Sequence, residues 1–215
     1  MRIIFTCSRE PKKSETPHRQ DLTKEAYMDY ASKDFRELVS RATSFHGHLC
    51  SGLYIGVRME VIAERLLNAH GKDEWFAIEV ETDRCPADGI LSAAGISIGR
   101  RRLKMLDYGK CAARFYDTRS GAGYRLLFNS QARPKKSDDI VDYFSNIADD
   151  SLFCITKIRK GFCSCDLPGP MTSIVVCADC GEEVQDCREV TWGGRPLCRP
   201  CHEERLRASA CADKR

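Results

Sequence analysis

The 215-residue sequence predicts an α+β fold, in which a mixed β-sheet core flanked by helices is followed by a small C-terminal treble-clef zinc finger. Helical and strand patterns alternate along most of the chain, with both hairpin and crossover connections, which is typical of such a sheet. Two Cys-x-x-Cys pairs near the C-terminus predict the finger. We therefore expect a flexible N-terminal arm at residues 1–20, the core domain at residues 21–165 and the finger domain at residues 171–215.

The first half of the core should contain two helices. The pattern becomes helical from Leu22, and apolar residues then repeat at helical spacing at Phe35, Leu38, Val39 and Ala42. A second helix should begin near Ser51 or Gly52 and end at Gly71, because glycine commonly follows a helix C-terminus. Within it, Gly56 lacks a side chain and should allow close packing by another element.

The remaining core elements are strands and shorter helices. Residues 111–117 and 124–130 should form an antiparallel hairpin, because the connection between them is short and contains glycine. In chain order the other expected elements are a strand at residues 75–82, a polar turn at residues 83–89, a short buried helix ending near Gly95 or Gly99, a helix from Asp138 to Ile147 and a strand at residues 153–158.

The central feature is the segment at residues 45–52 (FHGHLCSG), where two imidazoles and a thiol fall within five residues. His and Cys side chains are typical ligands of first-row metals. An extended segment would project His46, His48 and Cys50 to one side, whereas a helix would turn His48 away. The glycines favour the extended form, with Cys50 at a helix N-terminus. The alternative is a buried cysteine beside two hydrogen-bonded histidines.

A second polar turn should lie beside this segment. The strand at residues 75–82 leads directly to Cys85 and Asp88. Functional sites gather at strand ends, so we expect this turn to meet the segment from His46 to Cys50. The alternative is two ordinary connections at opposite ends of the sheet.

The finger prediction depends on Cys177, Cys180, Cys198 and Cys201, which form two pairs separated by 17 residues. Gly181 suits a tight knuckle after the first pair, Gly193 and Gly194 suit a hairpin, and the second pair opens a helical pattern. A redox dithiol and unrelated buried thiols are the alternatives. Cys187 and His202 are spare ligand candidates, and Asp179 is expected to be exposed. No role follows from the sequence for Cys163, Cys165 or Cys187.

Composition argues against membrane and nucleic-acid functions. No apolar run approaches the roughly 20 residues that a membrane helix needs. The apolar part of the N-terminal segment is shorter than the signal-peptide core of about 7 residues, so we expect a cytoplasmic protein. Residues 171–215 contain seven Lys and Arg against eight Asp and Glu. The segment therefore has no net positive charge with which to bind the phosphates of a nucleic acid. Thirteen cysteines, an odd number, disfavour a complete disulfide framework.

Taken together, these motifs resemble the FmdE family of formylmethanofuran dehydrogenase components from about Phe35 to Cys201. The matching motifs are FHGHLCSG at residues 45–52, GVRM at residues 56–59, VETDRC at residues 80–85 with Asp88, and DYGK at residues 107–110. Ser51 stands where the family has proline, and Ile96 stands where the family has a cysteine. The resemblance implies a five-stranded mixed sheet, a treble-clef module, a homodimer and a metal site in the core.

Two functions compete. The first is a metal-binding accessory protein of molybdenum- or tungsten-dependent one-carbon chemistry, with oxidoreductase subunits as partners. Zn²⁺ would then occupy the finger, and a second divalent metal would occupy a core site made by His46, His48, Cys50 and Cys85. The alternative is a stand-alone metal-dependent or Cys-dependent enzyme, with candidate catalytic residues Cys50, Asp83 and Asp88. A nucleic-acid-binding zinc protein is a third possibility, which the charge balance disfavours.

Overall fold

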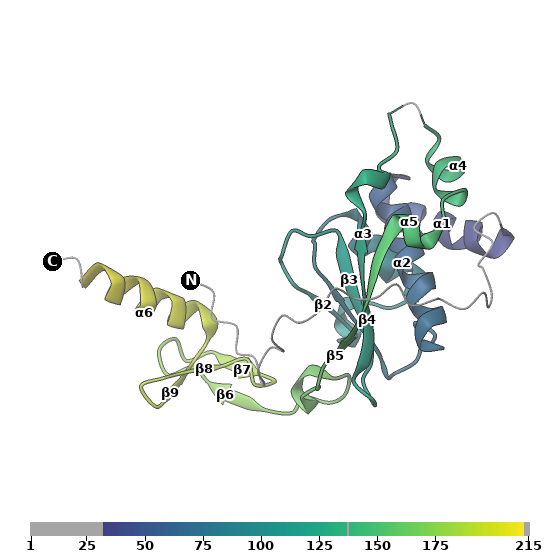
Figure 1. Cartoon of the computed structure of the whole chain (residues 1–215). Coiled ribbons are helices and arrows are strands. Elements are labelled where there is room, and N and C mark those ends of the chain that lie inside the picture. The colour runs from purple at the N-terminus through teal and green to yellow at the C-terminus, as the bar shows by residue number, and fades with distance from the viewer. Residues whose placement is uncertain (1–31, 137, 213–215) are drawn as a thin grey trace.

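The computed structural model describes residues 32–136 and 138–212 (Figure 1). The N-terminal arm expected at residues 1–20 and the start of the first helix near Leu22 lie outside the described residues. No helix within the described ranges combines the length and apolarity needed to cross a membrane.

A five-stranded mixed sheet forms the centre of the fold and confirms the α+β prediction. The strand order is β2-β1-β3-β4-β5, with β1 and β2 parallel and every other pair antiparallel. The β3–β4 pair is the hairpin predicted from the glycine-bearing connection. The strands are β1 (Phe76–Val80), β2 (Leu103–Met105), β3 (Ala112–Asp117), β4 (Ala122–Phe128) and β5 (Phe153–Arg159).

Helices cover one face of this sheet (Figure 1). The most buried is α2, in which all residues from 53 to 63 are buried, because the sheet lies on one side of it and other helices pack around the rest. The helices of the core are α1 (Lys33–His46), α2 (Ser51–Leu67), α3 (Cys85–Ala94), α4 (Ile140–Ser145) and α5 (Asp149–Leu152), with 3-10 turns η1 (Ile98–Arg100) and η2 (Ser130–Ala132).

The close approach of α2 to α3 depends on glycine on both helices. A Cβ atom at Gly56 would lie 2.2 Å from the carbonyl oxygen of Pro86, and one at Gly89 would lie 2.3 Å from the carbonyl oxygen of Leu53. These distances are far below van der Waals contact, so the two backbones could not pack this way around larger residues. The expected close packing at Gly56 is therefore present, and α3 is the element that uses it.

Three predicted boundaries were wrong, one of them because the helix expected from Asp138 to Ile147 spans only Ile140–Ser145. Helix α2 ends at Leu67 rather than at Gly71, because Asn68 adopts the left-handed conformation (φ 47°) that closes the helix. The polar turn expected at residues 83–89 is helical from Cys85, where Pro86 suits the first turn of a helix. The short strand β2 was not predicted, since it lies within a basic run.

The C-terminal part consists of two small hairpins and a helix, separate from the sheet (Figure 1). It follows β5 through the 3-10 turn η3 (Ser164–Asp166). Its elements are β6 (Ile174–Val176), β7 (Glu183–Gln185), β8 (Val190–Trp192), β9 (Arg195–Leu197) and α6 (Arg199–Ala212). The β8–β9 hairpin turns through Gly193 and Gly194 as predicted, and both glycines have positive φ.

Replacing Gly56 by Ala should destabilise the core by about 2 kcal/mol, because the new methyl group meets backbone atoms that cannot move aside easily. The measurement is the midpoint of urea unfolding. Gly99→Ala is the matched control, since a Cβ atom there meets nothing within 4 Å. Equal midpoints for the two variants would contradict the packing argument.

Candidate metal centres

The first candidate centre lies where α1 meets α2. His46 is the last residue of α1, His48 lies in the connection and Cys50 caps α2. The ligand atoms of these three residues all lie within 4.8 Å of one another. The predicted extended form is only partly correct, because His46 is helical and Gly47 reverses the chain in a left-handed conformation (φ 96°). This turn still brings both imidazoles to the same side as the thiol.

The two ring nitrogens of His46 have different surroundings. Nδ1 lies 2.8 Å from Oδ2 of Asp88, whereas Nε2 is buried and has no hydrogen-bond partner among the described residues. A buried nitrogen without a partner is costly, and a metal ion would satisfy it. A carboxylate on the other ring nitrogen is the usual way to orient a metal-binding histidine. The donor set therefore fits a metal ion.

Two cysteines meet beside these histidines. The backbone N–H of Leu53 donates to Sγ of Cys50 at 3.4 Å, which places this sulfur at the positive end of α2. Burial raises the pKa of the Cys85 thiol, and a hydrogen bond with Cys50 raises it further. The sulfur of Cys85 nevertheless lies outside the group whose atoms are all within 4.8 Å of one another. Cys85 thus borders the cluster formed by His46, His48 and Cys50.

Three further residues of the core, Asp88, Asp83 and Ile96, were singled out in the sequence. Asp88, in the first turn of α3, contacts His46 and so meets the segment that the sequence placed near it. Asp83 is exposed in the connection before α3. Ile96 packs, partly buried, against the hydrophobic core. Of the two aspartates proposed for acid–base or orienting roles, the structure brings only Asp88 to the histidines.

The second candidate centre contains the four cysteines of the two Cys-x-x-Cys pairs. The ligand atoms of Cys177, Cys180, Cys198 and Cys201 all lie within 4.8 Å of one another. The sulfurs of Cys180 and Cys198 are 3.8 Å apart. Zn–S bonds of about 2.3 Å in a tetrahedron place two sulfurs about 3.8 Å apart, so this spacing fits one zinc ion.

Backbone amides support the first pair. The N–H of Gly181 donates to the carbonyl oxygen of Cys177, with Gly181 in a left-handed conformation (φ 77°) that closes the knuckle. The N–H of Cys198 donates to Sγ of Cys177 at 3.2 Å. Hydrogen bonds from the amides of Cys180 and Cys198 lower the pKa of Cys177 to about 6. The local backbone therefore favours the thiolate form that a metal requires.

The spare ligand candidates of the finger lie outside this cluster. His202 is buried, and its ring packs edge-on against Trp192 at 5.1 Å. The carboxylate of Asp179 accepts hydrogen bonds from Arg205. Cys187 contacts Ser173 instead. These contacts leave the four paired cysteines as the ligand set.

Residues 45–152 match the family described as "FmdE, Molybdenum formylmethanofuran dehydrogenase operon". The chain belongs to the FmdE family. The match begins at the residue before His46 and ends at the last residue of α5, so it includes the whole core site. The four finger cysteines lie beyond it. The FmdE match therefore spans the residues of the core cluster and does not extend to the finger cysteines.

Two similar proteins add detail. A probable S-adenosyl-L-methionine-binding protein of Archaeoglobus fulgidus is 33% identical over 117 residues, which are 51% of this chain and 32% of that protein. The chain thus spans about a third of the length of this relative. The crystal structure of a tungsten formylmethanofuran dehydrogenase FmdE-like protein from Syntrophus aciditrophicus has a TM-score of 0.53 and 20% identity, covering 78% of this chain and 91% of that one. At this identity the likeness shows a shared fold.

Cys198→Ser should remove the metal from the C-terminal centre and unfold the surrounding hairpins, because such small elements draw folding free energy from the metal. The core sheet should remain folded, as measured by elemental analysis together with backbone hydrogen exchange. Cys187→Ser is the control, since this cysteine lies outside the cluster and its variant should keep the metal. Loss of the core in Cys198→Ser would show that the two parts do not fold separately.

Proposed function

We propose that this FmdE-family protein is a metal-binding accessory protein of molybdenum- or tungsten-dependent one-carbon oxidoreductase chemistry. The observation that carries the proposal is the buried Nε2 of His46, which has no partner among the described residues and lies within 4.8 Å of ligand atoms of His48 and Cys50. In this proposal a divalent metal binds these three side chains, with Cys85 as the neighbouring fourth ligand. The metal would supply Lewis acidity at this site.

The finger has a structural role in this proposal. A zinc ion on Cys177, Cys180, Cys198 and Cys201 would hold the two hairpins and α6 together as a treble clef. The sulfur spacing of 3.8 Å and the amide hydrogen bonds to Cys177 support this assignment. The association with a molybdenum enzyme is supported by the operon named in the family description. We also propose a homodimer, on the basis of the family resemblance.

The alternative proposal is an enzyme that acts by itself. The exposure of His48 at the cluster favours it, because one side of the site is open to solvent and thus to a substrate. Asp88 would then be a positioning residue rather than a general base, since its carboxylate is engaged with Nδ1 of His46. Cys50, which caps the N-terminus of α2, would be a ligand or a nucleophile.

The core site is tested by counting metals. The full-length protein should bind two metal ions per chain under metal-replete conditions, and mild chelation should remove the core ion first. The core ligands come from separate elements, so their geometry depends on the whole fold. His48→Ala should remove the core ion and spare the finger zinc. A protein that never holds more than one metal per chain would contradict the core proposal.

Asp88→Asn should weaken metal binding at the core site by about 10–100-fold, because the orienting carboxylate on His46 is lost. The measurement is competition against a chromophoric chelator. Asp83→Asn is the control, since Asp83 is exposed and its substitution removes the same negative charge close to Asp88 in the chain. Equal affinities for both variants would exclude the orienting role of Asp88.

The accessory role is tested by purifying tagged protein from native cells together with any bound partner. Tagged protein should co-purify with a molybdenum- or tungsten-containing enzyme, measured as enrichment of either element over an untagged control. Absence of enrichment, together with two metals bound per chain, would favour the stand-alone enzyme.

A further inference from the structure

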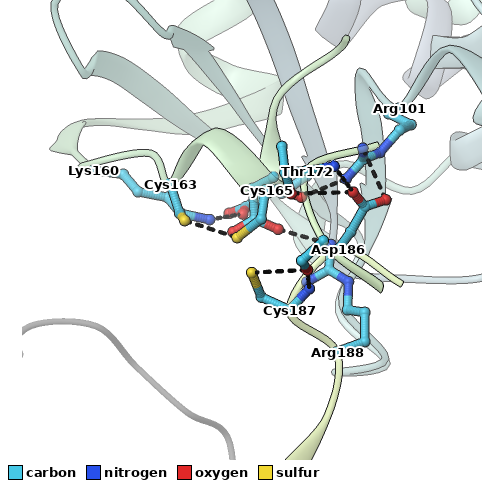
Figure 2. Close-up of polar contacts among 11 residues, drawn as sticks. Arg101, Lys160, Cys163, Cys165, Thr172, Asp186, Cys187 and Arg188 are labelled. Carbon is cyan, nitrogen blue, oxygen red and sulfur yellow. Dashed lines mark hydrogen bonds and ion pairs between the residues drawn. The ribbon is translucent and has the colours of Figure 1, made fainter. Parts of the chain in front are cut away.

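Three cysteines that belong to neither metal centre meet at the junction of the core and the C-terminal part. Cys163 and Cys165 lie where the chain leaves β5, and Cys187 follows β7. The sulfurs of Cys163 and Cys165 are 2.7 Å apart. Figure 2 shows these two sulfurs pointing toward each other, with the sulfur of Cys187 facing the pair. Cys165 is buried, whereas Cys163 and Cys187 are exposed.

The segment that carries the first two cysteines is held from both sides. Arg101, which follows η1 of the core, donates to the carbonyl oxygen of Cys165 and pairs with Asp186 at 3.0 Å. Arg188 of the C-terminal part donates to Asp166 at 2.8 Å. Figure 2 shows Arg101, Asp186 and Arg188 near the thiols. The relative positions of Cys163 and Cys165 are therefore set by the fold and not by a free loop.

The pKa values of the two thiols shift in opposite directions. Hydrogen bonds from the thiol and then from the backbone amide of Cys165 lower the pKa of Cys163. The hydrogen bond to Cys163, followed by burial, raises the pKa of Cys165 to about 12. An exposed thiol of lowered pKa beside a buried thiol of raised pKa is the arrangement of an attacking thiol and its resolving partner.

The spacing of the Cys163 and Cys165 sulfurs does not match two ligands of one tetrahedral zinc ion. Two thiolates on one tetrahedral zinc lie about 3.8 Å apart, as Cys180 and Cys198 do. Cys163 and Cys165 are much closer. Among the described residues, the groups of three or more ligand atoms within 4.8 Å of one another are the core cluster and the finger cluster, and neither includes Cys163, Cys165 or Cys187.

We propose that Cys163 and Cys165 form a thiol–disulfide exchange site, in which Cys163 attacks a low-molecular-weight disulfide such as glutathione disulfide and Cys165 resolves the product. The Cys163 thiolate forms a bond to one sulfur of the disulfide, whose S–S bond breaks and releases a thiolate that takes up a proton. Cys165 then loses its proton to solvent and attacks the Cys163 sulfur. This step forms the Cys163–Cys165 disulfide and releases the second small thiol, so one disulfide is reduced as one is formed.

The test uses the reduced, zinc-loaded full-length protein with glutathione disulfide as the oxidant. After acid quenching and alkylation, digestion with trypsin and Asp-N cuts after Lys160, before Asp166, before Asp186 and after Arg188. Residues 161–165 then carry Cys163 and Cys165 as their only cysteines, and residues 186–188 carry Cys187. Residues 161–165 should be recovered two hydrogens lighter and unalkylated, with two glutathiones released per chain.

Single variants separate the two roles. Cys165→Ser should stop at the mixed disulfide on Cys163 and release one glutathione per chain. Cys163→Ser should slow the first release by about tenfold or more, because the remaining thiol is buried and the exposed attacking thiol is lost. Cys154→Ser is the control, since it removes another exposed thiol, on β5, and should leave the kinetics unchanged. Circular dichroism should show that all three variants are folded.

Three outcomes would overturn the proposal. The first is an unchanged rate of glutathione release in Cys163→Ser. The second is a disulfide that links residues 161–165 to residues 186–188, which would make Cys187 the resolving thiol. The third is a further metal ion per chain that is lost in Cys163→Ser, which would make the three cysteines a metal site.

Discussion

The packing of α2 against α3 is the contact on which the core and its candidate site depend. Gly56 and Gly89 let the two backbones approach until a Cβ atom on either helix would meet a carbonyl oxygen of the other. This contact also places the N-terminus of α3 beside that of α2, because a Cβ atom at Gly52 would lie 3.0 Å from the Cβ atom of Cys85. The helices thus bring Cys85 and Asp88 to the end of α1, where the two histidines lie.

Buried charges hold α2 in place from its other side. The guanidinium of Arg58 is fully buried and donates to Asp149, while Arg65 contacts the same carboxylate. Removing one member of such a group would leave a buried charge without compensation. On the opposite face of the sheet, Glu81 is fully buried between Arg114 and Arg125. Burial alone would raise the pKa of Glu81, but the hydrogen bonds from Arg125 and Arg114 lower it.

The two candidate metal centres differ in how their ligands are assembled. The finger cysteines occupy two short knuckles, where local amides and a left-handed glycine set the sulfur positions. The core ligands come from the end of α1, a connection and the cap of α2, and one of them, His46, contacts Asp88 of α3. Local geometry survives small shifts in packing, whereas a site built from three helices does not.

The sequence by itself determined the mixed α+β core, the β3–β4 hairpin and the clustering of the four finger cysteines, because periodicity and spacing act over short distances along the chain. The sequence misplaced the end of α2, because Gly71 is a stronger helix-stop signal than Asn68. It also misplaced the start of α3, because the polar residues around Pro86 indicated a turn rather than a helix start. The sequence predicted that the turn with Asp88 would meet the segment from His46 to Cys50, but only the tertiary structure decided that Asp88 contacts Nδ1 of His46 and that Cys163 meets Cys165 beside Cys187. Asp88 and His46 are far apart in the chain. The positions of Cys163 and Cys165 depend on Arg101 and Arg188, which come from two different parts of the fold. No local sequence pattern encodes such contacts.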